Sequence, residues 1–361
     1  MKRTATLLMA MAALGLMSCS KSGQQDGKEK GRNTRTPPAE RLQKKASSYS
    51  GPKLSLPAKF TPGKYYSTES MDMSINMDMT DERSGQNQKI DTQMSVSIGA
   101  DAEITPVDSS SGEQSIRFIC RKAKTKVSVK AGANQKTLQY DSEGPEGRQD
   151  YELKRAIEPL LNAEFALFLK DGKFIRLDGI EMLIARVGSG PEGKQVSDMI
   201  EPMLKEMLEK HWGEAIPKMP VAPGDRWQGN IKLAPNPLLG ELGFQFDCIL
   251  QDFEDTPHGK VAVIDLAATV TAGEKPMKSN QFPAGTDVKL KDMLVDADGT
   301  ARFDLDLGVT TSITMDMRGT FNMSVQAGRE GGVVKVDLKA KFTGDWQRKG
   351  AAAESRRAAE P

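Results

Sequence analysis

One pattern constrains the fold of this chain more than any other: apolar and polar side chains alternate strictly over residues 70–79. The apolar positions are Met71, Met73, Ile75, Met77 and Met79, and Ser, Asp or Asn stands between them. Because successive side chains of a strand point to opposite faces, this period of two predicts a β-strand with one buried and one wet face. Antiparallel sheets are the usual setting for such strands.

The same alternation recurs along the chain, which is therefore predicted to be rich in long strands. It covers residues 94–104, 116–129, 244–250, 262–270, 313–317, 321–325 and 334–342. Two Asp-Gly pairs are typical of tight hairpin turns. Asp171-Gly172 separates residues 164–169 from 173–177, and Asp298-Gly299 separates residues 293–295 from 301–307.

We predict a β-dominated α+β fold with two repeated, curved antiparallel sheets, each like half of a barrel. The repeat is inferred because Pro62-Gly63 and Pro223-Gly224 each precede a first strand, and turns and strands then follow in the same order. Neither half covers its own apolar face, so a helix or the other sheet must cover it. The expected divisions are a signal peptide at 1–18, a disordered tether at 19–59, a first β-module at 60–190, a connecting helix at 191–216, a second β-module at 217–346 and a flexible tail at 347–361.

The connecting helix is the clearest helical pattern in the chain. Over residues 195–212, apolar side chains recur every three or four positions: Val196, Met199, Ile200, Met203, Leu204, Met207 and Leu208. This spacing places them on one face of a helix. A shorter helix is expected over residues 152–161, where Pro159 interrupts it.

The N-terminus has the anatomy of a secretory signal. Lys2 and Arg3 precede an uncharged, mostly apolar run over residues 5–17, which is too short to span a bilayer. Leu16-Met17-Ser18-Cys19 resembles the lipobox of bacterial lipoproteins. That resemblance implies cleavage before Cys19, diacylation of Cys19 and, with Ser20 next, attachment to the periplasmic face of the outer membrane. Two acyl chains give stable anchoring.

The next segment, residues 20–59, is rich in Lys, Arg, Gly, Gln, Ser and Pro. Such a composition cannot bury a core, so we expect a disordered tether that lets the folded part stand away from the lipid. The alternative is that its basic residues lie on anionic headgroups.

Residues 220–227, which read Pro-Val-Ala-Pro-Gly-Asp-Arg-Trp, resemble a motif of a family of exported bacterial lipoproteins of unknown function. The two Asp-Gly pairs add to this resemblance, which spans most of residues 60–346. It implies a duplicated β-sheet module in the cell envelope, and it implies no reaction.

No catalytic, metal or cofactor site is predicted. The 50 Lys and Arg nearly balance the 49 Asp and Glu, so no net field attracts nucleic acid. His211 and His258 are the only histidines, and neither has the neighbours of a catalytic triad. Asp296, Asp298, Asp304 and Asp306 supply the oxygen ligands that a calcium loop requires. The apolar residues that alternate with them instead favour a hairpin with these aspartates on its solvent-exposed face.

Beyond Cys19, the cysteines are Cys120 and Cys248, each on the apolar face of a predicted strand. We favour two free, buried thiols, because a disulfide requires Cα atoms within about 7 Å and no sequence pattern indicates that proximity. A disulfide formed in an oxidising periplasm is the alternative.

The methionines are the remaining functional signal, since 19 occur and several share strand faces. Flexible thioethers adapt to varied apolar shapes, although methionines also serve as plain core. We therefore favour a non-enzymatic binding or structural module of the cell envelope, with an unidentified lipid or protein partner. One alternative is a lipid or lipoprotein carrier, and another is an envelope hydrolase. The possible apolar cleft is lined by Met71, Met73, Met77, Met79, Met315, Met317 and Met323.

Overall fold

The computed structural model describes residues 36–56, 60–81, 85–179, 216–232, 242–257, 259–272, 275–277, 286–327 and 330–349. Six long strands dominate these residues: β1 (Gly63–Asp81), β2 (Asn87–Ile104), β3 (Glu113–Ala131), β11 (Thr286–Asp304), β12 (Val309–Ala327) and β13 (Glu330–Arg348). The others are β4 (Asn134–Asp141), β5 (Glu164–Lys170), β6 (Lys173–Asp178), β7 (Arg226–Lys232), β8 (Leu242–Thr256), β9 (Gly259–Ala272) and β10 (Lys275–Met277). The β-dominated class is thus confirmed.

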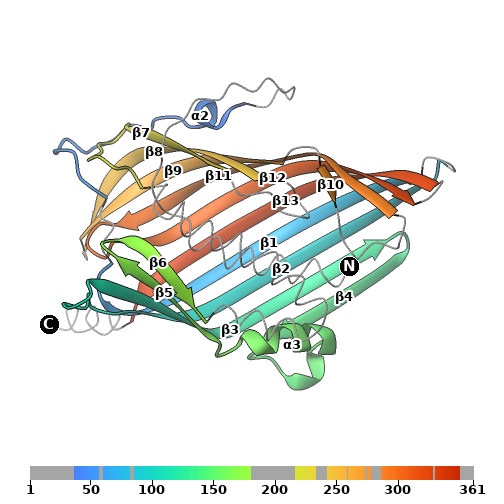
Figure 1. The fold of residues 1–361 in the computed structure, drawn as a ribbon, viewed down its shortest axis with the longest axis horizontal. Coiled ribbons are helices and arrows are strands. Elements are labelled where there is room, and N and C mark those ends of the chain that lie inside the picture. The colour runs from blue at the N-terminus through green and yellow to red at the C-terminus, as the bar shows by residue number, and fades with distance from the viewer. Residues whose placement is uncertain are drawn as a thin grey trace.

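The described strands form one curved antiparallel sheet (Figure 1). Its order is β6-β5-β3-β2-β1-β13-β12-β11-β9-β8-β7, with β4 on β3 and β10 on β11. The expectation of two separate sheets is therefore wrong, because β1 and β13 pair from Tyr65↔Arg348 to Asp81↔Gly332 and join the halves. Within each half the strands follow one another as a meander, but the long strands come first in one half and last in the other. The repeat stays a prediction.

The two faces of the sheet differ sharply in polarity. We call the inner face the one that carries Met71 and Met73, which are 7% and 5% exposed. Their neighbours on β1, such as Asp72 and Asn76, point to the outer face and are exposed. The period of two in the sequence is thus the cause of a sheet with one apolar and one wet side.

One short α-helix packs on the inner face at its β4 margin. It is α3 (Tyr151–Ile157), flanked by the 3-10 turns η1 (Glu146–Arg148) and η2 (Glu158–Leu160). Asp150 caps it, since its Oδ1 accepts hydrogen bonds from the backbone N–H of Glu152 and Leu153. Leu153 and Ile157 join Tyr140 and the inner-face residues of β1–β3 in one apolar cluster. Pro159 lies within η2, where the α-helix has ended, as the sequence indicates.

Residues 36–56, which we call the strap, correct the prediction of a disordered tether over 19–59. Its first part, with α2 (Pro38–Arg41), lies against the outer face of β8 and β9 (Figure 1). Further along, Leu54 and Leu56 join the apolar cluster on the inner face of these two strands. Leu42 packs on the fully buried Ile249 and Ala267. A segment with few apolar residues is ordered here because its polar groups find partners on the sheet, as described below.

The two Asp-Gly pairs behave differently. Asp171 and Gly172 have φ of 51° and 73° and form the predicted hairpin between β5 and β6. Asp298 and Gly299 instead lie inside β11, so the second hairpin prediction is wrong. A Cβ at Gly299 would lie 2.2 Å from the carbonyl oxygen of Thr314, so the glycine serves close strand packing.

Several predictions fall outside the described residues. They concern the signal peptide, Cys19, the tether as far as residue 35, the connecting helix at 195–212, and His211 and His258. Residues 347 and 348 of the expected tail at 347–361 belong to β13 instead, which continues to Arg348. Among the described residues, no helix is long and apolar enough to cross a lipid bilayer.

Candidate functional site on the inner face of the sheet

The sheet brings all seven predicted cleft methionines onto its inner face. We call these the inner-face methionines. They belong to β1 and β12, which flank β13. The register aligns them in rows: Met71 with Phe342 and Met315, Met73 with Ala340 and Met317, and Met79 with Val334 and Met323. Met77 faces Val336, whose other neighbour is Phe321. Residues more than 230 positions apart in sequence thus share one surface.

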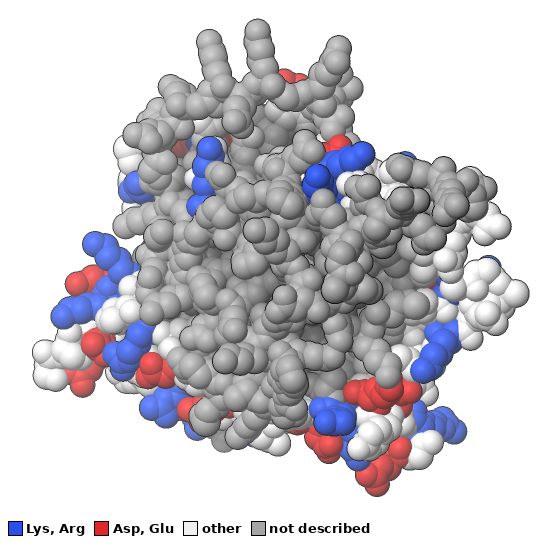
Figure 2. Space-filling model, turned by 45° about the vertical axis from the view of Figure 1, so that its right-hand side comes forward, with Lys and Arg blue, Asp and Glu red and all other residues white. Residues whose placement is uncertain are grey.

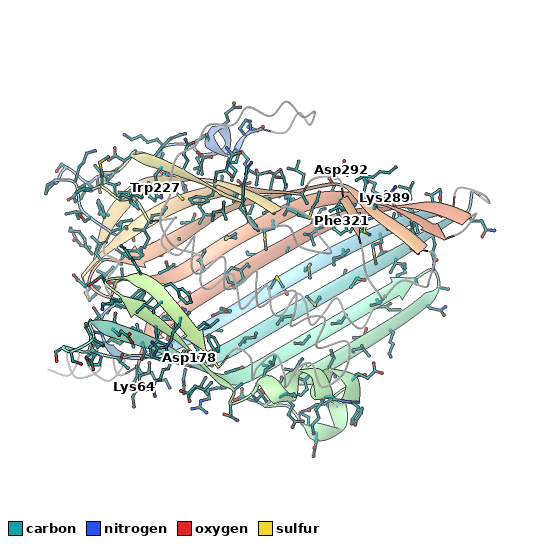
Figure 3. All side chains as sticks on the ribbon, viewed as in Figure 1. Lys64, Asp178, Trp227, Lys289, Asp292 and Phe321 are labelled. Atoms are coloured by element: carbon teal, nitrogen blue, oxygen red, sulfur yellow. The ribbon has the colours of Figure 1, made fainter. Side chains whose placement is uncertain are left out.

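The methionine surface extends beyond the predicted set. Met94 of β2 lies opposite Met73, and Met293 of β11 lies opposite Phe321. Figure 3 shows sulfur atoms spread over the central strands, with Phe321 among them. Met71, Met73 and Met94 are buried, whereas Met77, Met79, Met315, Met317 and Met323 are half-buried. The face is therefore apolar across neighbouring strands and is not fully sealed.

The size of this face follows from the strands that build it. The long strands contain 18 or 19 residues, which at about 3.3 Å per residue corresponds to about 60 Å. Neighbouring strands are about 4.8 Å apart, so the rows from β2 to β12 are about 14 Å wide. A surface of this shape matches extended hydrocarbon chains better than a compact, polar small molecule.

An aromatic cluster lies at the end of this face where β1 begins and β13 ends. Trp346 lies 5.7 Å from Phe118 and 6.1 Å from Tyr65, measured between ring centroids. The rings meet because the inner-face residues between them, Ser67 and Ala102, are small. The aromatic cluster and the methionines therefore occupy successive zones along β1.

Glu69 lies between those two zones and was missed by the sequence analysis. It stands on the inner face of β1, opposite Ile98 and Gly344, and is only 5% exposed. Among the described residues it has no hydrogen-bond or ion-pair partner. Burial raises the pKa of its carboxyl to about 8, because a charge in an apolar setting loses its hydration. Extending the odd-numbered apolar register back from Met71 would have placed Glu69 on the buried face.

Other polar groups surround Glu69 on the inner face. Thr125 of β3 is 1% exposed, and its hydroxyl has no hydrogen-bond partner among the described residues. It lies opposite Val96, which in turn lies opposite Met71, so it belongs to the row next to Glu69. Burial, with the nearby Glu69 charge second, raises the pKa of the Cys120 thiol to about 11. Cys120 and Cys248 are not joined in a disulfide.

The aspartates considered for calcium have structural partners instead. Asp296 and Asp298 face the strap, where Arg41 pairs with them at 3.2 and 3.3 Å. The Oδ1 of Asp304 accepts hydrogen bonds from the backbone N–H of Asp306 and Leu307 in the turn after β11. Within the described residues, no group of three or more His, Cys, Asp or Glu side chains is arranged to hold a metal ion.

Charges of both signs are mixed around the margin of the molecule (Figure 2). On the outer face, the Lys124 ammonium pairs with Asp141 at 3.1 Å, and that of Lys122 pairs with Glu143 at 2.7 Å. Such mixed surfaces create no single-sign field that would steer a polyanion. The inner face is thus the part of the described molecule whose chemistry most departs from an ordinary wet surface.

Comparisons with known proteins show no family. No family model matches the chain, and no curated protein matches it. Among solved structures, the chain is similar to one of lipovitellin that concerns lipid–protein interactions in that protein. The two share 10% identity with a TM-score of 0.39, and the match covers 80% of this chain but only 26% of the lipovitellin chain.

Two bacterial structures are also similar. The outer membrane protein OprG from Pseudomonas aeruginosa has 8% identity and a TM-score of 0.24, over 81% of this chain and 99% of that one. A DUF1329 family protein from Desulfovibrio piger has 10% identity and a TM-score of 0.11, over 80% and 87%. At these TM-scores the likenesses carry no argument about function.

Proposed function

We propose that this protein is a lipid-binding module of the cell envelope whose inner face holds acyl chains. The observation that carries the proposal is the convergence of the seven inner-face methionines on β1 and β12, the two strands that flank β13. Unbranched thioether side chains adapt to ligands of varied shape, which suits hydrocarbon chains of different length. The proposed role is binding without catalysis.

The contrast between the two faces supports a ligand that is apolar rather than polar. Among the described residues, the outer face is largely charged and hydrated, whereas the inner face offers a large apolar area. Pockets for apolar ligands are lined mainly by hydrophobic side chains with a few polar groups that fix orientation. The inner face has this composition, and Glu69 and Thr125 are among its buried polar groups.

The location is proposed from the sequence. Cys19 with its preceding signal would carry two acyl chains and anchor the chain at the periplasmic side of the outer membrane. Labelled palmitate is expected to enter the wild-type protein and not the Cys19→Ala variant. Equal labelling of both would remove the anchor from the proposal and leave the binding face untouched.

Titration with a fluorescent 18-carbon acyl probe tests the binding role. Met317→Gln places a polar amide of similar length on the inner face and is expected to weaken binding about tenfold or more. Thr314→Gln, three residues away on the exposed outer face of the same strand, is the matched control and should bind like the wild type. No binding by the wild type, or equal loss in both variants, would contradict the proposal.

A further inference from the structure

We propose that Glu69 is the polar anchor of this face: its carboxyl donates a hydrogen bond to the carbonyl oxygen of an uncharged acyl group, whose hydrocarbon chain lies along the inner-face methionines. This inference rests on the proposed function and specifies its ligand. The acyl group belongs either to a protonated fatty acid or to an acyl ester, since both present the same carbonyl oxygen.

The first argument is that Glu69 is buried and has no partner in the part of the chain that the structure describes. A carboxyl that is 5% exposed and unpaired among the described residues lowers the stability of the fold. A leucine at this position would continue the apolar face at no such cost. Buried polar groups without partners are rare in folded proteins and often have a functional role. The missing partner is accounted for if a ligand supplies it.

The second argument is the position of Glu69 along β1. The side chains of Met71, Met73, Ile75, Met77 and Met79 follow it on the same face. The distance from Glu69 to Met79 is ten residues, or about 33 Å of strand. One acyl chain spans half of a bilayer core, or about 15 Å. A chain anchored at Glu69 would thus be covered by these methionines along its whole length.

The third argument is the charge around Glu69. Among the described residues, Cys120 on β3 is affected by the Glu69 charge, and Tyr65 and Tyr140 lie farther away on the same face; burial raises the pKa of all three. They are neutral near pH 7, as is Glu69. The charged groups that act on these three are Arg121 at Cys120, Arg348 and Asp304 at Tyr65, and Glu158, Lys154 and Asp141 at Tyr140. Because burial is what raises the pKa of Glu69, its described surroundings match an uncharged carbonyl rather than an anionic phosphate headgroup.

Thr125 adds a second hydrogen-bonding group to the site. Its buried hydroxyl also has no partner among the described residues and lies one row from Glu69 across β2. The two groups lie on β1 and β3, about 10 Å apart across β2, so Thr125 offers a second polar position on the face rather than a second bond to the same oxygen. Two unpaired polar groups facing the same apolar surface point to a ligand more strongly than either alone.

The test is a titration of the full-length protein with cis-parinaric acid and with its methyl ester, at pH 6.5 and pH 9.5. The ester has no ionisable group, so a pH effect in that arm comes from the protein. The variants are Glu69→Leu, which removes the hydrogen bond, and Glu69→Gln, whose amide keeps a donor and never ionises. Thermal unfolding of each variant confirms that it is folded.

We expect the wild type to bind the ester at pH 6.5 and at least tenfold more weakly at pH 9.5, where Glu69 is ionised. Glu69→Gln should bind equally at both pH values, and Glu69→Leu about tenfold more weakly than wild type at pH 6.5. If the wild type binds cis-parinaric acid but not its methyl ester, the natural ligand is a fatty acid rather than an acyl ester. The weaker binding expected of Glu69→Leu is then measured with the acid.

Two outcomes would overturn the inference, and they are distinguishable. Wild type and Glu69→Leu binding the probes equally, with the same pH profile, would overturn the anchor and leave lipid binding intact. No binding of either probe by the wild type would overturn the proposed function, and the anchor with it.

Discussion

Glu69 makes the folded state sensitive to pH. Its carboxyl keeps a proton up to a pKa of about 8 when folded, whereas the unfolded chain releases it near the ordinary value of 4.5. Between these values the folded state binds more protons, so the free energy of unfolding falls as the pH rises, by about 1.4 kcal/mol per pH unit.

We predict that this loss is absent in Glu69→Gln, which has no proton to release. Urea denaturation at pH 5, 6.5 and 8 measures it, as the difference between the variant and the wild type at each pH. If the stability curves of the two proteins run parallel across this range, the carboxyl is not held protonated by burial.

Individual residues were only partly predictable from the sequence. The methionines lie on a common face, as their period of two indicates, because this period fixes the face of a strand locally; the apolar cleft that they would line stays a prediction. Glu69 was missed because the apolar register was read only from Met71 onward, and a glutamate usually marks a wet position. Asp298-Gly299 was read as a turn, yet β11 runs on through both residues, and Gly299 allows the close approach of β12, the next strand along the chain.

Among the elements, the strap shows how polar contacts order a segment with few apolar residues. The guanidinium of Arg226 donates hydrogen bonds to the carbonyl oxygens of Ala39 and Leu42, at 2.9 and 2.8 Å. The side-chain amide of Gln251 donates a hydrogen bond to the carbonyl oxygen of Gln43 and accepts one from the backbone N–H of Lys45, both at 2.8 Å. These partners come from β7 and β8, so no local feature of residues 36–56 could reveal them.

Leu42 is the apolar contact that we expect to hold the first part of the strap on the outer face. Its side chain is 8% exposed and packs on Ile249 and Ala267, which are fully buried. Leu42→Ala is predicted to lower the free energy of unfolding by about 2–4 kcal/mol and to speed proteolysis at Lys44 and Lys45.

The matched control for the strap is Lys53→Ala. The Lys53 ammonium pairs with Asp225 at 2.7 Å in a largely exposed setting, so its loss should change stability by less than about 1 kcal/mol. If Leu42→Ala and Lys53→Ala change the free energy of unfolding by similarly small amounts, the strap does not depend on the contact of Leu42.

For the molecule as a whole, the sequence predicted the strands but not their assembly into one sheet. Alternation is a local signal, whereas the pairing of β1 with β13 joins residues about 280 positions apart and is decided by tertiary packing. That pairing is what places Met71 and Met315 on a common surface. The proposed lipid-binding face is therefore a property of the complete sheet and of neither half alone.

The central claim is that this surface holds acyl chains. Native mass spectrometry of the protein purified from its own cells, with non-covalent lipid counted apart from the acyl chains on Cys19, tests it most directly. The account predicts that the wild type retains lipid, in amounts that fall in Met317→Gln and not in Thr314→Gln. Repeated preparations of folded wild-type protein without any bound lipid would contradict it.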